Sequence, residues 1–166
     1  MRRILLYLLL LAVMCSCCND IAIDEKWLED NYSKTEAMVT MRDGVKLYTS
    51  VYQPVDSDDR PVLLVRTPYS CAPYGDGWKG DLTEYMTEFL RNKYILVFQD
   101  VRGRYMSEGE YENVRPYNPD KSGNEIDEAS DTYDTIEWLL ANTDNNGSVG
   151  GSGMSYPGFY AAMAAL

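Results

Sequence analysis

The sequence predicts an α/β fold: a mostly parallel sheet with helices on both faces. Two short, continuous apolar runs are typical of strands that are buried on both faces, and a segment with apolar residues at helical spacing separates them. An Asp-Gly turn between two strand-like segments adds an antiparallel hairpin before this alternation begins. Strands and helices that alternate along a chain imply parallel strand pairing.

The hairpin is the first predicted element. Residues 37–41 and residues 45–52 are strand-like segments, and Asp43-Gly44 lies between them. Asp-Gly is a strong hairpin signal because glycine accepts the positive φ that a tight turn requires. Pro54 ends the second strand.

The two apolar runs are residues 61–66 (P-V-L-L-V-R) and residues 94–98 (Y-I-L-V-F). Each is bounded by polar or turn-forming residues, as expected of a buried strand. A helix is predicted between them, and Asp81 followed by Glu84 is a candidate capping box at its start. The apolar residues of this helix are Leu82, Tyr85, Met86, Phe89 and Leu90.

A second helix is predicted over residues 128–141. The acidic side chains of Asp127, Glu128 and Asp131 suit the positive N-terminal end of a helix. The residues that share its apolar face are Ala129, Tyr133, Ile136, Leu139 and Leu140.

A turn at residues 145–147 is followed by a short strand around Val149, and residues 159–166 begin another helix. The strand, residues 148–152, is rich in glycine, which weakens a strand interior. Its pairing within the sheet is therefore in doubt from the sequence.

Between that strand and that helix lies a serine flanked by glycines. A serine on a sharp turn from strand to helix is typical of the nucleophile elbow of α/β-hydrolases. Gly153 precedes Ser155 by two residues, but Gly158 follows it by three, so the common G-x-S-x-G pattern is missed by one residue. A Gly/Ser-rich turn without chemistry is the alternative. The position after a strand and before a helix favours the elbow.

Four motifs occur in a fixed order along the chain. They are M-R-D-G-V-K-L (41–47), R-T-P-Y (66–69), D-V-R-G-R-x-x-S-E-G (100–109) and G-x-S-Y-x-G (153–158). Together they resemble the serine hydrolase family that includes Xaa-Pro dipeptidyl-peptidases, cocaine esterase, α-amino-acid ester hydrolases and glutaryl-cephalosporin acylases. The resemblance covers residues 34–166. It implies an α/β-hydrolase fold and cleavage of an ester or amide, with an Xaa-Pro dipeptidyl group among the candidate acyl groups, through an acyl-enzyme.

The resemblance also assigns roles to three residues. It makes Ser155 the nucleophile and the phenol of Tyr69 an oxyanion donor. A phenolic O–H at the carboxyl end of a buried strand can point at a developing oxyanion, and the backbone N–H of Tyr156 supplies a second donor. Without the resemblance, Tyr69 is one of fourteen tyrosines and a structural role is favoured.

Two charged segments are interpreted as structural. Residues 100–109 are expected to have a structural role. Arg102, Gly103 and Arg104 are expected to form a buried turn whose charges pair locally. A later acidic run is expected to be a solvated face plus a helix cap, and binding of a substrate ammonium is the alternative. This run comprises Asp120, Glu125, Asp127, Glu128, Asp131 and Asp134.

The chain contains no histidine. A serine hydroxyl needs a base to accept its proton, and in α/β-hydrolases the acidic and histidine members follow the serine. Only residues 156–166 follow Ser155, so we expect an N-terminal portion of a catalytic domain, truncated after the elbow and inactive alone. The alternatives are a remnant and a non-catalytic envelope lipoprotein that uses the same scaffold for binding.

The N-terminus is expected to be a lipoprotein signal peptide. Arg2 and Arg3 precede an apolar run over residues 4–14, which is shorter than the ~20 residues of a membrane-spanning helix. Ser16 and Cys17 follow, and Cys17 is the expected lipidation site. An ordinary secretory signal is the alternative.

This assignment divides the chain into a signal peptide (1–16), an acidic tether (17–33) and part of a catalytic domain (34–166). The expected location is the bacterial cell envelope, by a lipid anchor in the periplasm or on the surface, or the exterior after secretion.

Composition narrows the expected partners. A net charge of −11 argues against nucleic acid, whose backbone binds basic surfaces. We expect a small-molecule or peptide acyl substrate and contact with membrane only through the anchor. Without histidine, no metal site is predicted, and no glycine-rich phosphate loop indicates a cofactor.

Overall fold

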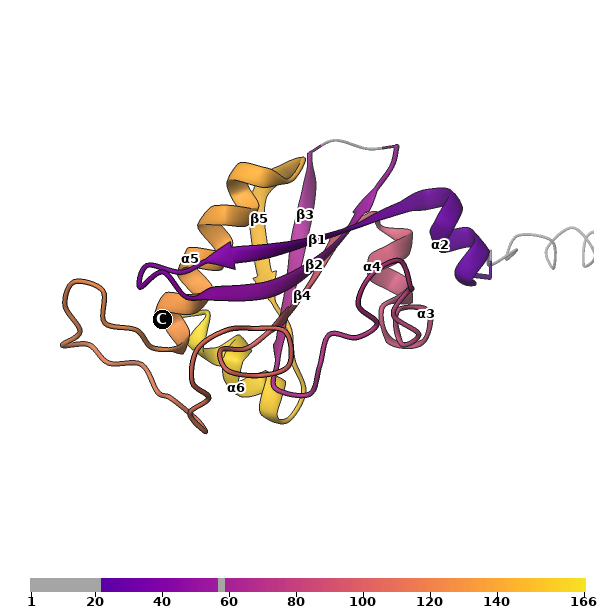
Figure 1. Ribbon diagram of the computed structural model, residues 1–166. Coiled ribbons are helices and arrows are strands. Elements are labelled where there is room, and N and C mark those ends of the chain that lie inside the picture. The colour runs from indigo at the N-terminus through magenta and orange to yellow at the C-terminus, as the bar shows by residue number, and fades with distance from the viewer. Residues whose placement is uncertain (1–21, 57–58) are drawn as a thin grey trace, which may run out of the picture.

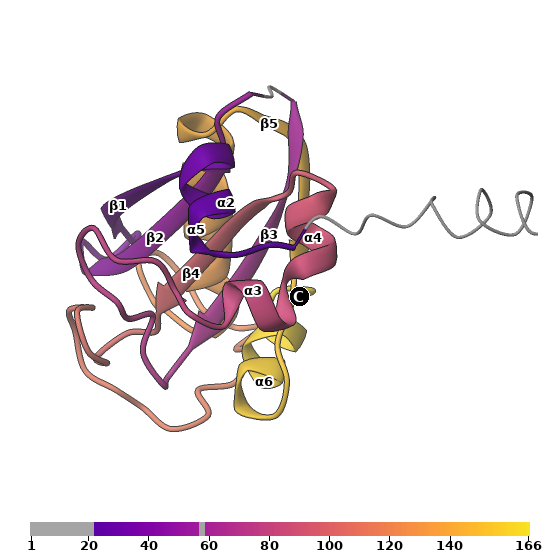
Figure 2. The ribbon, with the colours of Figure 1, turned by 90° about the vertical axis from the view of Figure 1, so that its right-hand side faces the viewer.

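The computed structural model describes residues 22–56 and 59–166; the predicted signal peptide and Cys17 lie outside these ranges. A five-stranded sheet has the order β1-β2-β4-β3-β5, and helices cover both of its faces (Figures 1 and 2). The strands are β1 (Tyr32–Thr40), β2 (Lys46–Pro54), β3 (Arg60–Thr67), β4 (Ile95–Asp100) and β5 (Asn145–Gly151). This mixed sheet confirms the predicted α/β class.

The predicted hairpin is present and longer than expected. β1 and β2 pair antiparallel from Tyr32 opposite Pro54 to Thr40 opposite Lys46. Gly44 lies in the connecting turn with a φ of 89°, and its N–H donates to the carbonyl of Met41. The requirement for positive φ thus explains the Asp-Gly signal.

The centre of the sheet is parallel. β3 pairs in parallel with β4 on one side and with β5 on the other, and β2 pairs antiparallel with β4. All six residues of β4 are buried, as the continuous apolar run predicts. The glycine-rich β5 is paired with β3 despite the doubt that its composition raised.

Alternate residues of β3 and β4 face two separate apolar cores. Leu63 and Leu96 pack on one face with Leu28, Leu82 and Leu90 of the short helices α2 (Glu25–Asn31), α3 (Leu82–Tyr85) and α4 (Thr87–Arg91). On the other face, Leu64 and Val97 pack against Leu139 of α5 (Glu128–Asn142). The last helix, α6 (Tyr156–Met163), contacts β3 and α5.

Of the two predicted helices before β5, the second is confirmed and the first is wrong as a single helix. Asp127 and Ser130 form a reciprocal capping box at the start of α5, which confirms that helix. The helix predicted after Asp81 is wrong as a single element, because the chain leaves helical geometry at Met86 (φ −112°, ψ 9°) and forms α3 and α4 instead. The side chain of Asp81 makes no capping hydrogen bond.

The segment expected to be a tether includes α2. Its Asp24 cap accepts a hydrogen bond from the N–H of Trp27, and Leu28 is buried. Tyr32, at the start of β1, donates its hydroxyl to the carbonyls of Leu90 and Tyr94. Residues before Lys34 therefore contribute to the core. No helix in the described part of the chain is long and apolar enough to span a membrane.

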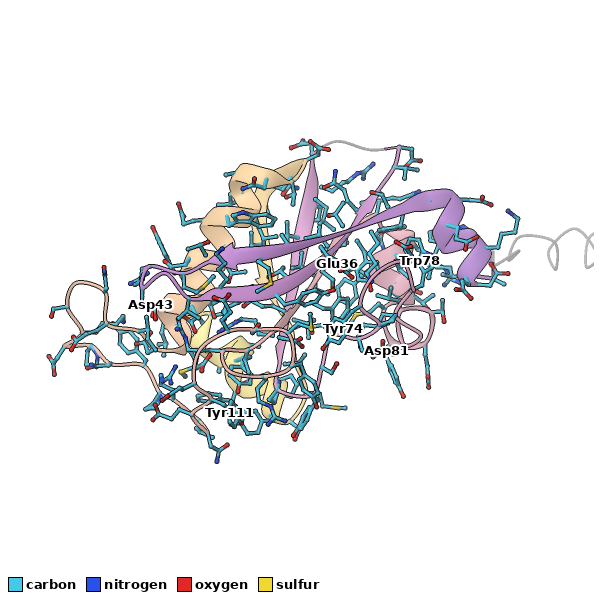
Figure 3. The ribbon with its side chains drawn as sticks, viewed as in Figure 1. Glu36, Asp43, Tyr74, Trp78, Asp81 and Tyr111 are labelled. Carbon is cyan, nitrogen blue, oxygen red and sulfur yellow. The ribbon has the colours of Figure 1, made fainter. Side chains whose placement is uncertain are left out.

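A buried ionic network joins the hairpin turn, the sheet and α5. Arg102 is bonded to Asp43 (2.7 Å) and to Asp131 (2.7 Å), which lie 59 and 29 residues away. The prediction of locally paired charges is therefore wrong for Arg102. Arg66 of β3 lies 3.1 Å from the carboxylate of Glu128 and 3.8 Å from that of Asp131. Asp43 lies at the turn of the β1–β2 hairpin (Figure 3).

The same network corrects the interpretation of the acidic run. Glu128 and Asp131 are almost fully buried, so for these two residues the predicted solvated face is wrong. Burial raises the pKa of Glu128 despite its pairing with Arg66. Burial would also raise the pKa of Asp43, but hydrogen bonds from Arg102 and from the Val45 N–H lower it overall.

Replacement of Arg102 tests this network. Arg102→Met should lower the free energy of unfolding by about 3–5 kcal/mol, because it leaves the carboxylate of Asp131 buried with one cation fewer. Urea denaturation of the purified full-length protein measures the change. Lys26→Ala, which removes an exposed ion pair with Asp30, is the control and should leave the midpoint unchanged. Equal urea midpoints for the two variants would contradict a stabilising role of the buried ionic network.

Candidate active site

The candidate site lies where the parallel strands end. β3, β4 and β5 run in the same direction, so the segments that follow them leave the sheet at one edge (Figure 1). These segments carry Tyr69, the 100–109 motif and Ser155. In open α/β sheets ligands bind beyond the carboxyl ends of the strands. The fold therefore brings the predicted site residues to one region.

Ser155 lies on a strained turn between β5 and α6. Its backbone has a φ of 61° and a ψ of −123°, a conformation that residues other than glycine seldom adopt. The residue is exposed and occupies the N-cap position of α6, and its side chain makes no capping hydrogen bond. Ser155 is therefore presented to solvent, as the elbow prediction requires.

The two glycines of the turn lie against each other. A Cβ on Gly153 would lie 2.2 Å from the carbonyl oxygen of Pro157, and one on Gly158 would lie 3.2 Å from the carbonyl oxygen of Gly153. The N–H of Gly158 donates to the carbonyl of Ser155 (3.0 Å). Gly158 thus lies against Gly153, and of the two positions Gly153 is the one that has no space for a side chain.

β5 packs against α6 at Gly151. A Cβ on Gly151 would lie 3.5 Å from the Cβ of Ala164 and 3.7 Å from the Cα of Ala161. Small residues on both elements permit this close packing. Gly151 thus lies where the strand and the helix that flank Ser155 pack together, with space for a methyl group.

Tyr69 lies two residues beyond β3, and its side chain is exposed. Its ring contacts the ring of Tyr156 edge to face, with centroids 6.2 Å apart. The backbone N–H of Tyr69 donates to the hydroxyl of Thr67 (3.0 Å). The structure therefore places Tyr69 beside the residue that follows Ser155.

Tyr156 is the first residue of α6, so its backbone N–H has no acceptor within the helix. Its phenol is held on the far side by residues 111–114: it accepts from the N–H of Val114 (2.9 Å), contacts the Tyr111 hydroxyl (2.9 Å) and donates to Asn113. Figure 3 shows Tyr111 at this edge of the molecule. Sequence reasoning missed Tyr111 and Asn113, because no spacing distinguishes them.

Tyr160 connects the site to the ionic network. It is buried one turn below Tyr156, with ring centroids 5.4 Å apart. The guanidinium of Arg66 lies 5.7 Å from the Tyr160 ring centroid. Burial raises the pKa of the Tyr160 phenol, so it stays neutral. Among residues 22–56 and 59–166, no group of acidic or cysteine side chains could hold a metal ion.

Comparison with known proteins identifies the family. A family model described as X-Pro dipeptidyl-peptidase (S15 family) matches residues 43–166. The chain belongs to this family. The match covers residues 43–47 of the first motif and all of the other three motifs, including the Ser155 turn, so the S15 assignment confirms the resemblance drawn from the motifs.

The chain is also similar to an esterase, an aminopeptidase and an ester hydrolase. The chain is 37% identical over 140 residues to the cocaine esterase of Rhodococcus sp. (strain MB1 Bresler), with 84% of this chain and 22% of the relative covered. An aminopeptidase from a marine sediment Thaumarchaeota archaeon matches with a TM-score of 0.71 and 34% identity, over 90% of this chain and 25% of that one. An α-amino acid ester hydrolase matches with a TM-score of 0.70 and 37% identity, over 90% and 26%. The chain thus spans about a quarter of the length of these relatives.

The contact between the two glycines is testable. Gly153→Ala should lower stability by about 3 kcal/mol or more, because its Cβ would overlap backbone atoms that cannot move without opening the turn. Gly158→Ala is the matched control and should change stability by no more than about 1 kcal/mol. Its Cβ would lie 3.2 Å from the carbonyl oxygen of Gly153, and the higher helix propensity of alanine offsets the cost of this tight contact. Thermal unfolding of both variants provides the comparison. Equal melting temperatures would refute the proposed packing.

Proposed function

We propose that this chain supplies the nucleophile and the oxyanion hole of a serine hydrolase that cleaves an ester or amide through an acyl-enzyme. The observation that carries the proposal is the exposed Ser155 at positive φ, at the N-terminus of α6 and next to Tyr156, whose ring contacts that of Tyr69. Membership of the S15 family supports the hydrolase class. The names of the esterase, aminopeptidase and ester hydrolase relatives support an acyl substrate.

In this mechanism the Oγ of Ser155 attacks the acyl carbonyl carbon and loses its proton to a base. The carbonyl oxygen becomes an oxyanion, which accepts hydrogen bonds from the Tyr69 phenol and the Tyr156 N–H. The N-terminal end of the α6 dipole adds a favourable potential. As the intermediate collapses, the bond to the leaving group breaks and the protonated base gives its proton to the departing alcohol or amine. Water then attacks the acyl-enzyme, with its proton passing through the base to the Oγ of Ser155, and the acid is released.

The base is proposed to come from outside these 166 residues. The chain has no histidine and spans 22–26% of the relatives it matches. An Xaa-Pro dipeptidyl group is proposed among the acyl groups, since the family is described by that activity. The exposed edge at Ser155 leaves room for further polypeptide to complete the pocket.

A fluorophosphonate probe tests the nucleophile. The protein produced from its complete coding sequence should be labelled covalently, and Ser155→Ala should abolish labelling, because the probe phosphonylates an activated serine. Ser152→Ala is the matched control in the same turn and should retain labelling. Labelling of Ser155→Ala at the original rate would overturn the proposal and leave a non-catalytic binding protein as the better account.

We also propose that the protein is anchored to a bacterial envelope membrane by lipid at Cys17. The apolar run over residues 4–14 and the cysteine after Ser16 support this location. Cells that express the protein with radiolabelled palmitate should incorporate label, and Cys17→Ser should abolish incorporation while Cys18→Ser retains it. Unchanged incorporation in Cys17→Ser would contradict the anchor.

A further inference from the structure

The 100–109 motif lies against the loop that carries Tyr69. Asp100, the last residue of β4, is fully buried and bonds to both segments. Its Oδ1 accepts from the N–H of Cys71 (2.8 Å), and its Oδ2 accepts from the Tyr74 hydroxyl (2.9 Å) and the Met106 N–H (3.2 Å). A single carboxylate therefore fixes the backbone two residues after Tyr69. Figure 3 labels Tyr74.

These contacts require a carboxylate. An ionised Asp only accepts hydrogen bonds, whereas one side of an amide donates. Because backbone N–H groups contact both oxygens of Asp100, an asparagine would oppose one of them with a second donor. Burial raises the pKa of Tyr74 to about 12, and the hydrogen bond to the Asp100 carboxylate contributes to this increase. The Tyr74 phenol therefore remains a donor.

Arg104 holds the other side of the same loop. Its Nε donates to the carbonyl of Pro68 (3.1 Å), the residue before Tyr69. Its guanidinium also lies 5.0 Å from the ring centroid of Tyr111, whose hydroxyl contacts that of Tyr156. Arg104 thus connects the backbone next to Tyr69 with the side chain of the residue next to Ser155.

Tyr69 is exposed, so the backbone contacts on either side of it are its main restraints. The side chain is 62% exposed and touches the ring of Tyr156, so few neighbours restrain the phenol directly. The hydrogen bonds to Pro68 and Cys71, on either side of Tyr69, hold the backbone from which its side chain extends. A displacement of about 1 Å in a catalytic group can cost about 10²-fold in rate.

We propose that Asp100 and Arg104 are positioning residues that hold the Tyr69 phenol in the oxyanion hole. This inference rests on the proposed roles of Ser155 and Tyr69, and it gives residues 100–109 a function in catalysis beyond architecture. Arg104 in addition keeps the two proposed oxyanion donors, the Tyr69 phenol and the Tyr156 N–H, in a fixed relation.

A double-mutant cycle tests the inference, with the second-order rate of fluorophosphonate labelling of the full-length protein as the readout. Tyr69→Phe should lower the rate by about 10²–10³-fold, because one oxyanion donor is lost. Arg104→Met should lower it about 10-fold when Tyr69 is present and less than about 2-fold in combination with Tyr69→Phe, since coupled residues are not additive. A merely structural role would lower both backgrounds equally.

Two further variants guard against misfolding and general charge effects. Arg104→Lys keeps the charge but lacks the planar Nε–H, and should lose rate as Arg104→Met does. Arg91→Met removes an arginine on α4 that pairs with Glu88, and should label normally. Asp100→Asn should show the same dependence on Tyr69, and circular dichroism confirms that each variant is folded.

The outcomes separate this inference from the proposed function. Equal losses for Arg104→Met with and without Tyr69→Phe, or no loss at all, would overturn the positioning role while labelling at Ser155 still stands. If Ser155→Ala is labelled like the original protein, the proposed function itself fails.

Discussion

The parallel pairing of β3 with both β4 and β5 is the constraint on which the site depends. This register sets Thr67 opposite Asp100 and Leu64 opposite Gly151. Because the three strands run in one direction, the Tyr69 loop, the 100–109 motif and the Ser155 turn leave the sheet at a common edge. Residues that are far apart in sequence thereby become neighbours.

Buried ion pairs connect the carboxyl ends of these strands to α5 and to the hairpin turn. Arg66 extends from β3 to Glu128 and Asp131 on α5, and its guanidinium also lies over the ring of Tyr160 on α6. Arg102, just beyond β4, adds Asp43 of the hairpin turn. Since buried ions are costly unless they are paired, the network favours one arrangement of these elements. Tyr160 belongs to the helix that begins directly after the strained turn at Ser155.

Local signals allowed much of the fold to be predicted from sequence. The Asp-Gly turn, the two apolar runs and the cap at Asp127 each act within a few residues, and the hairpin, the two strands and the helix that they predict are present. Ser155 and Tyr69 were found through motifs that resemble a known family. The partners of Arg102, and the contacts of Tyr111 with Tyr156, depend on segments that meet only in three dimensions. The break at Met86 also escaped prediction, because the apolar spacing continues across it.

The most direct test of the account is a crystal structure of the full-length protein inhibited by a phosphonate that mimics the tetrahedral intermediate. The account predicts a covalent bond from phosphorus to the Oγ of Ser155, with the phosphonyl oxygen within hydrogen-bond distance of both the Tyr69 hydroxyl and the Tyr156 N–H. A phosphonyl oxygen turned towards solvent, or attachment to another residue, would contradict it.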